Sequence, residues 1–135
     1  KCPVSGRRNF SKIRRSARFS PDGVEKAGDV SFVAAGGGGE RLGAVWMRFW
    51  NEEDHSFGFV DEDTPELGVA VVQHMRGKGI GTALLKSLVS HARVLGIKKL
   101  SLSVQPDNPS RLLYEKLGFI KTGEFESAWT MVLDI

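Results

Sequence analysis

The sequence predicts a single α/β domain, and three observations support this prediction. Leu67 to Val72 is a short apolar run that follows Pro65, as expected at the start of a strand. From Gly79 to Leu95, apolar residues recur at helical spacing instead. The chain has 135 residues, of which 41% are hydrophobic and 26% are charged, which suits one globular domain with a core. We therefore expect residues 1–135 to form one domain.

The other elements are predicted from local patterns along the chain. Asn9 to Phe19 is expected to form a short basic helix that ends at a Pro-Asp-Gly turn, and the run Gly36 to Gly39 suits a hairpin loop. The long helix should stop at Gly96, and a second helix should begin at Asn108-Pro109, with Asn as its cap, and stop at Gly118. The expected strands are Val30 to Ala35, Leu42 to Trp50, Phe57 to Val60, Leu67 to Val72, Leu100 to Val104, Phe119 to Phe125 and Ala128 to Leu133.

Composition excludes several classes of site. One cysteine, Cys2, excludes an internal disulfide and a Cys-based zinc site, and three scattered histidines predict no metal. No apolar run approaches the roughly 20 residues that span a membrane, so we expect no membrane partner and a cytoplasmic location.

The net charge of +3 is unevenly distributed along the chain. Basic residues crowd residues 1–18, and we interpret this arm as a solvated terminus, with nucleic-acid binding as the less favoured alternative. Acidic residues crowd residues 52–66. A solvated loop explains this acidic window, and an electrostatic funnel for a cationic amine is its functional alternative.

A glycine-rich loop joins the strand at Leu67 to Val72 to the long helix. In Arg76-Gly77-Lys78-Gly79-Ile80-Gly81, three glycines at alternate positions leave the backbone open to a ligand and allow positive φ angles. The helix that follows offers unpaired N–H groups and the positive end of its dipole. A plain tight turn is the alternative, but the combination with a helix start predicts a phosphate site. Neither the Walker pattern nor the dinucleotide fingerprint fits, because Thr82 and Ala83 follow the last glycine.

Two motifs in this chain resemble those of a known family. The first is Arg-x-x-Gly-x-Gly after an apolar strand, formed by Arg76, Gly79 and Gly81, and it resembles the pyrophosphate loop of the GNAT superfamily of acetyl-CoA-dependent N-acetyltransferases. The second, Asn108 to Phe119, resembles the other GNAT signature, in which an Asn precedes a helix with a Tyr and then Leu-Gly-Phe. The two motifs follow the order and spacing of the family, and the resemblance covers Val30 to Leu133.

The resemblance implies a GNAT core at residues 30–135, after a basic and weakly matched segment at residues 1–29. This core would be an α/β fold with a central mixed, mostly antiparallel sheet flanked by helices. Its strands around Val69 and Leu102 would splay apart to hold acetyl-CoA or coenzyme A. Family members usually open with a strand and a helix that frame the acceptor site. No such strand is recognisable before Val30, so a truncated or remodelled start is expected.

The resemblance also implies which residues hold the cofactor. A bulge in the strand at Leu67 to Val72 would leave backbone groups free to pair with the pantetheine arm, and Gly77 to Thr82 would hold the pyrophosphate through backbone N–H groups. Asn108 would touch the end of pantetheine, or would simply cap its helix. The implied cofactor-binding residues are Val69, Ala70, Val71, Arg76, Gly77, Lys78, Gly79, Ile80, Gly81, Thr82 and Asn108.

The implied reaction is direct attack of an amine on the thioester carbonyl, with a backbone N–H of the bulged strand steadying the oxyanion. Tyr114 is the implied general acid for the leaving thiolate, because a phenol with a pKa of about 10 is protonated at neutral pH. A half-buried core aromatic is the alternative interpretation of Tyr114. Glu66 and His74 are candidate bases, although Glu66 also starts a strand and His74 suits an exposed loop.

We therefore expect an N-acetyltransferase that transfers an acetyl group from acetyl-CoA to a primary amine of a small molecule or peptide. The alternative is a non-catalytic acyl-CoA-binding or regulatory domain that keeps the cofactor site. A third option, nucleic-acid binding through the basic arm, would use the fold as a platform only. The sequence leaves the identity of the amine and the oligomeric state open, with a homodimer as one option.

Overall fold

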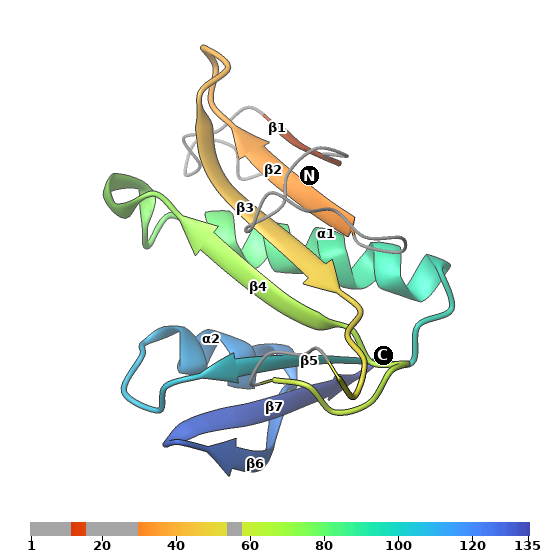
Figure 1. The fold of residues 1–135 in the computed structure, drawn as a ribbon. Coiled ribbons are helices and arrows are strands. Elements are labelled where there is room, and N and C mark those ends of the chain that lie inside the picture. The colour runs from red at the N-terminus through yellow and green to blue at the C-terminus, as the bar shows by residue number, and fades with distance from the viewer. Residues whose placement is uncertain (1–11, 16–29, 54–57) are drawn as a thin grey trace. The chain divides into compact units, whose positions relative to one another are not determined.

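The structure, a computed structural model, describes residues 12–15, 30–53 and 58–135 (Figure 1). Its helical elements are the 3-10 turn η2 (Gln73–Met75) and the helices α1 (Ile80–Val94) and α2 (Ser110–Leu117). None of these is both long and apolar enough to cross a bilayer. The strands are β1 (Lys12–Arg15), β2 (Val30–Ala35), β3 (Arg41–Arg48), β4 (Glu66–Val71), β5 (Lys99–Val104), β6 (Ile120–Phe125) and β7 (Ala128–Asp134).

The described strands follow the order β1-β2-β3-β4-β5-β7-β6. β4 and β5 pair in parallel, at Glu66 and Ser101. The pairs β1 with β2, β2 with β3, β5 with β7 and β7 with β6 are antiparallel. The prediction of an α/β fold with a mixed, mostly antiparallel sheet is therefore confirmed.

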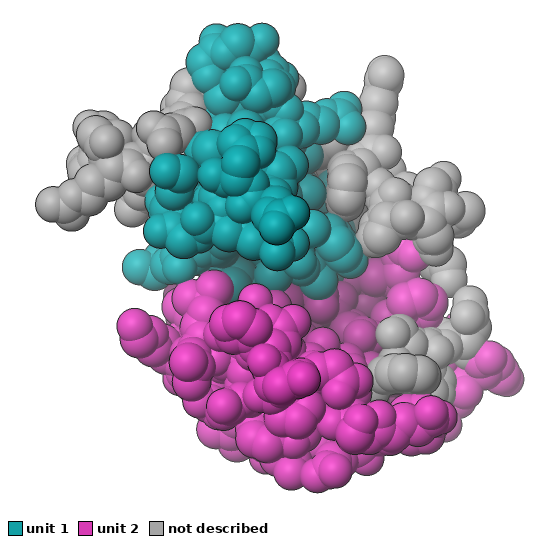
Figure 2. All heavy atoms as spheres, turned by 90° about the vertical axis from the view of Figure 1, so that its left-hand side faces the viewer, with its two compact units in different colours: residues 1–47, 68–91 teal, residues 48–67, 92–135 magenta. Residues whose placement is uncertain are grey.

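The chain divides into two compact units (Figure 2). Unit 1 comprises residues 1–47 and 68–91, and unit 2 comprises residues 48–67 and 92–135. The units alternate in sequence because β3, β4 and α1 each begin in one unit and end in the other.

In unit 1, β2 and β3 form a hairpin around the glycine run, as the sequence predicts. The Gly36 N–H donates to the Glu40 carbonyl at 2.8 Å, and Gly39 turns the chain with a φ of 90°. Glycine adopts this left-handed conformation without steric cost. The opposite edge of β2 pairs with β1.

The first three turns of α1 supply apolar side chains that are almost completely buried in unit 1. Ile80, Leu84, Leu85 and Leu88 are at most 1% exposed, and their spacing is the helical period predicted from the sequence. Ile80 belongs to the glycine-rich loop sequence and is the first residue of α1. The burial of this helix face therefore fixes the N-terminus of α1, to which the loop is joined.

In unit 2, β5, β7 and β6 form an antiparallel group, and α2 follows β5 in the chain. Both helices end at a glycine in the left-handed conformation, with φ angles of 82° at Gly96 and 110° at Gly118. After α1, the Ile97 N–H reaches back to the Ala92 carbonyl at 3.0 Å, which completes a Schellman motif. Both helix stops agree with the sequence prediction.

The basic helix predicted at Asn9 to Phe19 is wrong over the part that the structure describes. Lys12–Arg15 is the strand β1, in which Ile13 lies opposite Ala34 of β2. The remainder of the predicted helix lies outside the described residues. Pairing with the edge of β2 decides the conformation of this segment, and such a non-local effect is invisible in a local charge pattern. A strand does therefore precede Val30, contrary to the expectation from the sequence.

The strand predicted at Phe57 to Val60 is also wrong in its described part. Phe57 lies outside the described residues, and residues 58–60 form no strand. The buried Gly58 instead donates its N–H to Oε2 of Glu66 at 3.2 Å. A Cβ on Gly58 would lie 2.9 Å from the backbone carbon of Leu102, so the chain passes too close to β5 for a side chain.

Candidate active site

The glycine loop lies in unit 1, between β4 and the N-terminus of α1. Gly77 and Gly79 have φ angles of 79° and 86°, which glycine adopts readily and other residues rarely do. The first helical hydrogen bond joins the Ala83 N–H to the Gly79 carbonyl at 3.0 Å. The N–H groups of residues 80–82 precede this bond and stand at the positive end of the helix dipole. This is the backbone geometry of an anion site.

Two buried side chains hold the loop at its ends. Met75 is 6% exposed and Ile80 is 1% exposed, whereas residues 76–79 between them are exposed. The Arg76 side chain turns back and donates from Nε to the Val71 carbonyl at 3.3 Å. Nothing lies within 4 Å of the position that a Cβ on Gly77 would take. The loop is therefore anchored at both ends and open along its length.

Sequence reasoning did not single out Gly43, which controls how closely three elements of unit 1 approach one another. A Cβ on Gly43 would lie 3.0 Å from the Ala70 carbonyl oxygen, 3.2 Å from Leu84 and 3.3 Å from Ile80. The strand before the loop and the helix after it thus both pack against this one backbone position on β3. A glycine inside a predicted strand is the signal that could have found it, because it often marks close backbone approach.

Gly68, in the part of β4 that belongs to unit 1, allows an aromatic ring to lie close against the strand. A Cβ on Gly68 would meet the indole of Trp46 at 2.6 Å. Trp46 lies on β3, so its ring covers the backbone of the neighbouring strand. The candidate pantetheine residues Val69, Ala70 and Val71 follow directly in the chain.

Asn108 in unit 2 caps α2, as the sequence predicts. Its side-chain oxygen accepts a hydrogen bond from the Ser110 N–H at 2.9 Å, and its backbone carbonyl accepts one from the Arg111 N–H at 3.0 Å. Arg111 in turn donates from Nε to the Pro106 carbonyl at 2.8 Å. These bonds fix the loop between β5 and α2, which sets the position of the helix that carries Tyr114.

Tyr114 is buried in unit 2, with 7% of its surface exposed. Burial raises the pKa of its phenol, and a hydrogen bond with the Ser110 side chain offsets part of this rise. The Tyr114 ring meets the Phe119 ring edge-on, with 5.8 Å between centroids. The phenol is therefore held in place and fully protonated at neutral pH, which is the state that a proton donor requires.

The two candidate bases differ in their surroundings. Glu66 is partly buried, and its carboxylate accepts the Gly58 N–H. Its partner across the sheet is Ser101, whose hydroxyl is buried and, among the described residues, has no hydrogen-bond partner. His74 is exposed on η2 in unit 1. Glu66 is therefore the better sheltered of the two candidates, whereas His74 faces solvent.

The structure thus groups the predicted site residues in two sets. The loop residues 76–82 and the strand residues 69–71 belong to unit 1. Glu66, Asn108 and Tyr114 belong to unit 2. Each set keeps a distinct chemical character, with an open backbone anion site in the first and a carboxylate and a phenol in the second.

A model described as the acetyltransferase (GNAT) family matches residues 7–119 of this chain. The chain belongs to the GNAT family. The match begins well before Val30, so the family likeness includes β1 and part of the basic segment that was predicted to be weakly matched.

Curated relatives share part of their length with this chain. An L-methionine sulfoximine/L-methionine sulfone acetyltransferase from Pseudomonas paraeruginosa is 31% identical over 104 residues, which are 76% of this chain and 58% of that protein. A mycothiol acetyltransferase from Corynebacterium glutamicum is 38% identical over 73 residues, which are 50% of this chain and 25% of that protein. The chain therefore spans 58% or less of the length of these two relatives.

Solved structures show the same fold. The GNAT domain of S. lividans PAT aligns with a TM-score of 0.68 at 22% identity, covering 79% of this chain and 61% of that one. The PaiA N-acetyltransferase of Thermoplasma acidophilum, in complex with coenzyme A, aligns with a TM-score of 0.65 at 18% identity, with the same coverage of 79% and 61%. The GNAT fold is therefore shared with a protein that holds coenzyme A.

Proposed function

We propose that this chain transfers an acetyl group from acetyl-CoA to a primary amine of a small molecule or peptide. The observation that carries the proposal is the glycine loop, an open anion site with two positive-φ glycines at a helix N-terminus, in a chain of the GNAT family. Two relatives are named as acetyltransferases, one for mycothiol and one for L-methionine sulfoximine and L-methionine sulfone, which supports acetyl transfer as the reaction.

The cofactor is proposed to bind through the backbone. The N–H groups of residues 77–82 would hold the pyrophosphate, because the open space at Gly77 and the exposure of residues 76–79 leave room for it. Backbone groups of Val69, Ala70 and Val71 would pair with pantetheine. In the fully described strands β4 and β5, the parallel pairing joins only Glu66 and Ser101. This limited pairing supports the proposal that backbone groups further along β4 can pair with pantetheine. Asn108 would reach the pantetheine end without leaving its capping role.

The chain's own groups would then assist the transfer. Bound acetyl-CoA supplies an activated acetyl thioester. A backbone N–H of β4 donates a hydrogen bond to the carbonyl oxygen as negative charge develops there. The Tyr114 hydroxyl donates its proton to the departing sulfur, and Glu66 accepts the proton that the amine nitrogen loses. The protected, protonated phenol and the partly buried carboxylate suit these two roles.

We also propose that the acceptor carries a positive charge. Asp61, Glu62 and Asp63 are exposed in the turn that leads into β4. Exposed carboxylates attract a cationic amine over a range of about 8–10 Å at physiological ionic strength. Added salt should therefore raise the KM for a diamine more than the KM for an amino acid, whose net charge is zero.

A screen of amine acceptors with acetyl-CoA, followed by release of free thiol, tests the proposed function. Polyamines, amino acids and peptide N-termini should separate into acceptors and non-acceptors. Calorimetry should show that the chain binds acetyl-CoA, whichever amine is the acceptor. Binding of acetyl-CoA without thiol release across the whole screen would favour the non-catalytic binding domain instead. Absence of acetyl-CoA binding would contradict both.

A further inference from the structure

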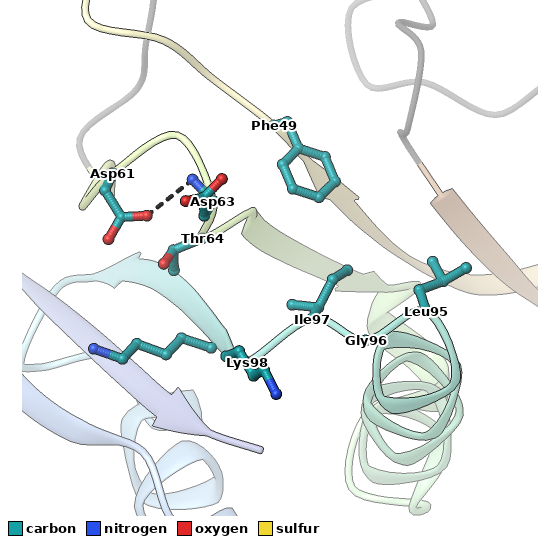
Figure 3. A pocket seen from close by; sticks show the side chains of 9 residues that line it. Phe49, Asp61, Asp63, Thr64, Leu95, Gly96, Ile97 and Lys98 are labelled. Carbon is teal, nitrogen blue, oxygen red and sulfur yellow. Dashed lines mark hydrogen bonds between the residues drawn. The ribbon is translucent and has the colours of Figure 1, made fainter.

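Unit 2 contains a pocket of about 450 Å³ (Figure 3), and two of the carboxylates proposed above to attract the acceptor, Asp61 and Asp63, line it. Three segments line it: the turn before β4 with Asp61, Asp63 and Thr64, the connection from α1 to β5 at residues 95–99, and Phe49 after β3. Figure 3 shows Asp61 and Asp63 on one side, Leu95 and Ile97 on the other, and Phe49 above them. The volume lies in the range of small-molecule sites, about 300–1,000 Å³.

The pocket carries charges of both signs. Asp61 and Asp63 stand on one wall, and Lys98 and Lys99 belong to the connection that leads into β5. In the described part of the chain, none of these four side chains forms an ion pair; the recorded pairs join Arg111 to Glu115 and Lys121 to Glu124. Opposite charges that line one cavity without neutralising each other are complementary to a ligand that carries both signs.

The two carboxylates have different tasks. Oδ1 of Asp61 accepts a hydrogen bond from the Asp63 N–H at 2.9 Å, and the Asp61 carbonyl accepts one from the Thr64 N–H at 3.3 Å. Asp61 therefore shapes the turn, in the manner of an Asx turn. Asp63 is exposed and contributes no side-chain hydrogen bond to the turn, which leaves its carboxylate for a ligand.

We propose that this pocket binds a zwitterionic ligand of the α-amino-acid class with an apolar side chain. The ligand ammonium pairs with Asp63, the ligand carboxylate pairs with Lys98, and the apolar side chain contacts Phe49 and Ile97. Asp63 and Lys98 are exposed, so each ion pair alone is weak, and the ligand needs both charges together with the apolar contact for affinity.

This pocket is distinct from the glycine loop and from the cap of α2, which are proposed to hold the cofactor, although Thr64 on its wall lies two residues before Glu66. Lys98 and Lys99 lie where β5 begins, whereas Asn108 follows the point where β5 ends at Val104. A strand of six residues spans about 20 Å, so the pocket and the cap of α2 lie at opposite ends of β5. Binding at this pocket can therefore be measured without acetyl-CoA, and its outcome does not depend on the proposed function.

Calorimetry on the full chain with three matched probes tests the charge requirement. L-leucine carries both charges, isopentylamine carries only the ammonium and 4-methylpentanoate carries only the carboxylate. Leucine should bind saturably, and each singly charged analogue should bind at least about tenfold more weakly. Absence of saturable leucine binding up to about 10 mM, or equal binding of either analogue, would overturn the proposal.

Two variants and a neighbouring control locate the binding. Asp63→Asn and Lys98→Gln should each weaken leucine binding at least about tenfold. Glu62→Gln alters the same exposed turn but not the pocket lining, so it should leave leucine affinity unchanged. An equal loss in Glu62→Gln would reveal general surface electrostatics and overturn the proposal. Leucine binding should also persist in Gly79→Asp, and its loss there would place the ligand at the glycine loop instead.

Discussion

Phe119 contacts Tyr114 through both its backbone and its ring. Its N–H donates to the Tyr114 carbonyl at 3.0 Å, and its ring meets the Tyr114 ring edge-on with 5.8 Å between centroids. Gly118, at a φ of 110°, provides the left-handed turn that brings Phe119 back onto α2. The Leu-Gly-Phe sequence is therefore a helix stop that also fixes the tyrosine proposed to donate a proton.

Phe119→Leu should loosen Tyr114 without removing it. The aromatic pair contributes about 0.5–1.5 kcal/mol beyond simple burial, so the free energy of unfolding should fall by at least that amount. Turnover should also fall while acetyl-CoA affinity is kept, because only the orientation of the phenol changes. Phe125→Leu is the matched control, since Phe125 is 50% exposed on β6 and should cost little in either measurement. Equal effects of the two substitutions would show that the contact does not position Tyr114.

The raised pKa of Tyr114 predicts how stability depends on pH. The folded chain holds the phenolic proton more tightly than the unfolded chain, whose phenol titrates near the ordinary pKa of about 10. The stabilisation is complete below about pH 10 and is lost as the pH rises through the higher folded pKa. Tyr114 is the only tyrosine in the sequence, so tyrosinate absorbance reports on this group alone. Urea unfolding should show a smaller loss of stability above about pH 10 for Tyr114→Phe than for the parent chain, because only the contribution of the phenol is removed. Identical pH profiles would contradict the buried phenol.

Gly43→Ala should destabilise unit 1 and disturb the glycine loop. The new Cβ would press on the Ala70 carbonyl oxygen at 3.0 Å, and a backbone atom yields less easily than a flexible side chain. Overpacking of this kind costs about 1–3 kcal/mol of unfolding free energy. Gly123→Ala on β6 is the control, because nothing lies within 4 Å of its added Cβ. If the Gly43→Ala chain were as stable as the Gly123→Ala chain, the close approach of Gly43 to Ala70 would not explain the need for glycine at this position.

These contacts show which features the sequence could predict. Helix α1, its stop at Gly96 and the Asn108 cap rest on interactions within a few residues, so local pattern and capping rules found them. Strand β1 depends on pairing with β2, and the contact between Gly43 and Ala70 joins separate strands. The pocket brings together residues 49, 61–64 and 95–99, whose proximity exists only after folding. The motifs identified the candidate cofactor loop and Tyr114. They did not identify Gly43 and Gly68, which pack near the loop, or the pocket in unit 2.

Gly79→Asp should abolish acetyl-CoA binding. The substitution puts a negative charge beside the N–H groups at the start of α1 and a side chain on a residue with a φ of 86°. Gly79→Ala separates these effects, because it introduces only the conformational cost, about 1–2 kcal/mol. Calorimetry on both folded variants should show weakened binding for Ala and none for Asp. Unchanged affinity in Gly79→Asp would exclude the loop as the phosphate site.

Tyr114→Phe decides between an acetyltransferase and a non-catalytic acyl-CoA-binding domain. The substitution keeps the ring and its edge-on contact with Phe119, so the fold and acetyl-CoA affinity should survive. Loss of the hydroxyl removes the proposed proton donor to the departing sulfur, and turnover should fall about 10²–10⁴-fold if that departure limits the rate. Stopped thiol-release assays on the folded variant, with calorimetry in parallel, measure turnover and binding separately. Full turnover in Tyr114→Phe would reduce Tyr114 to a core aromatic, whereas lost turnover with intact binding assigns the proton transfer to its hydroxyl.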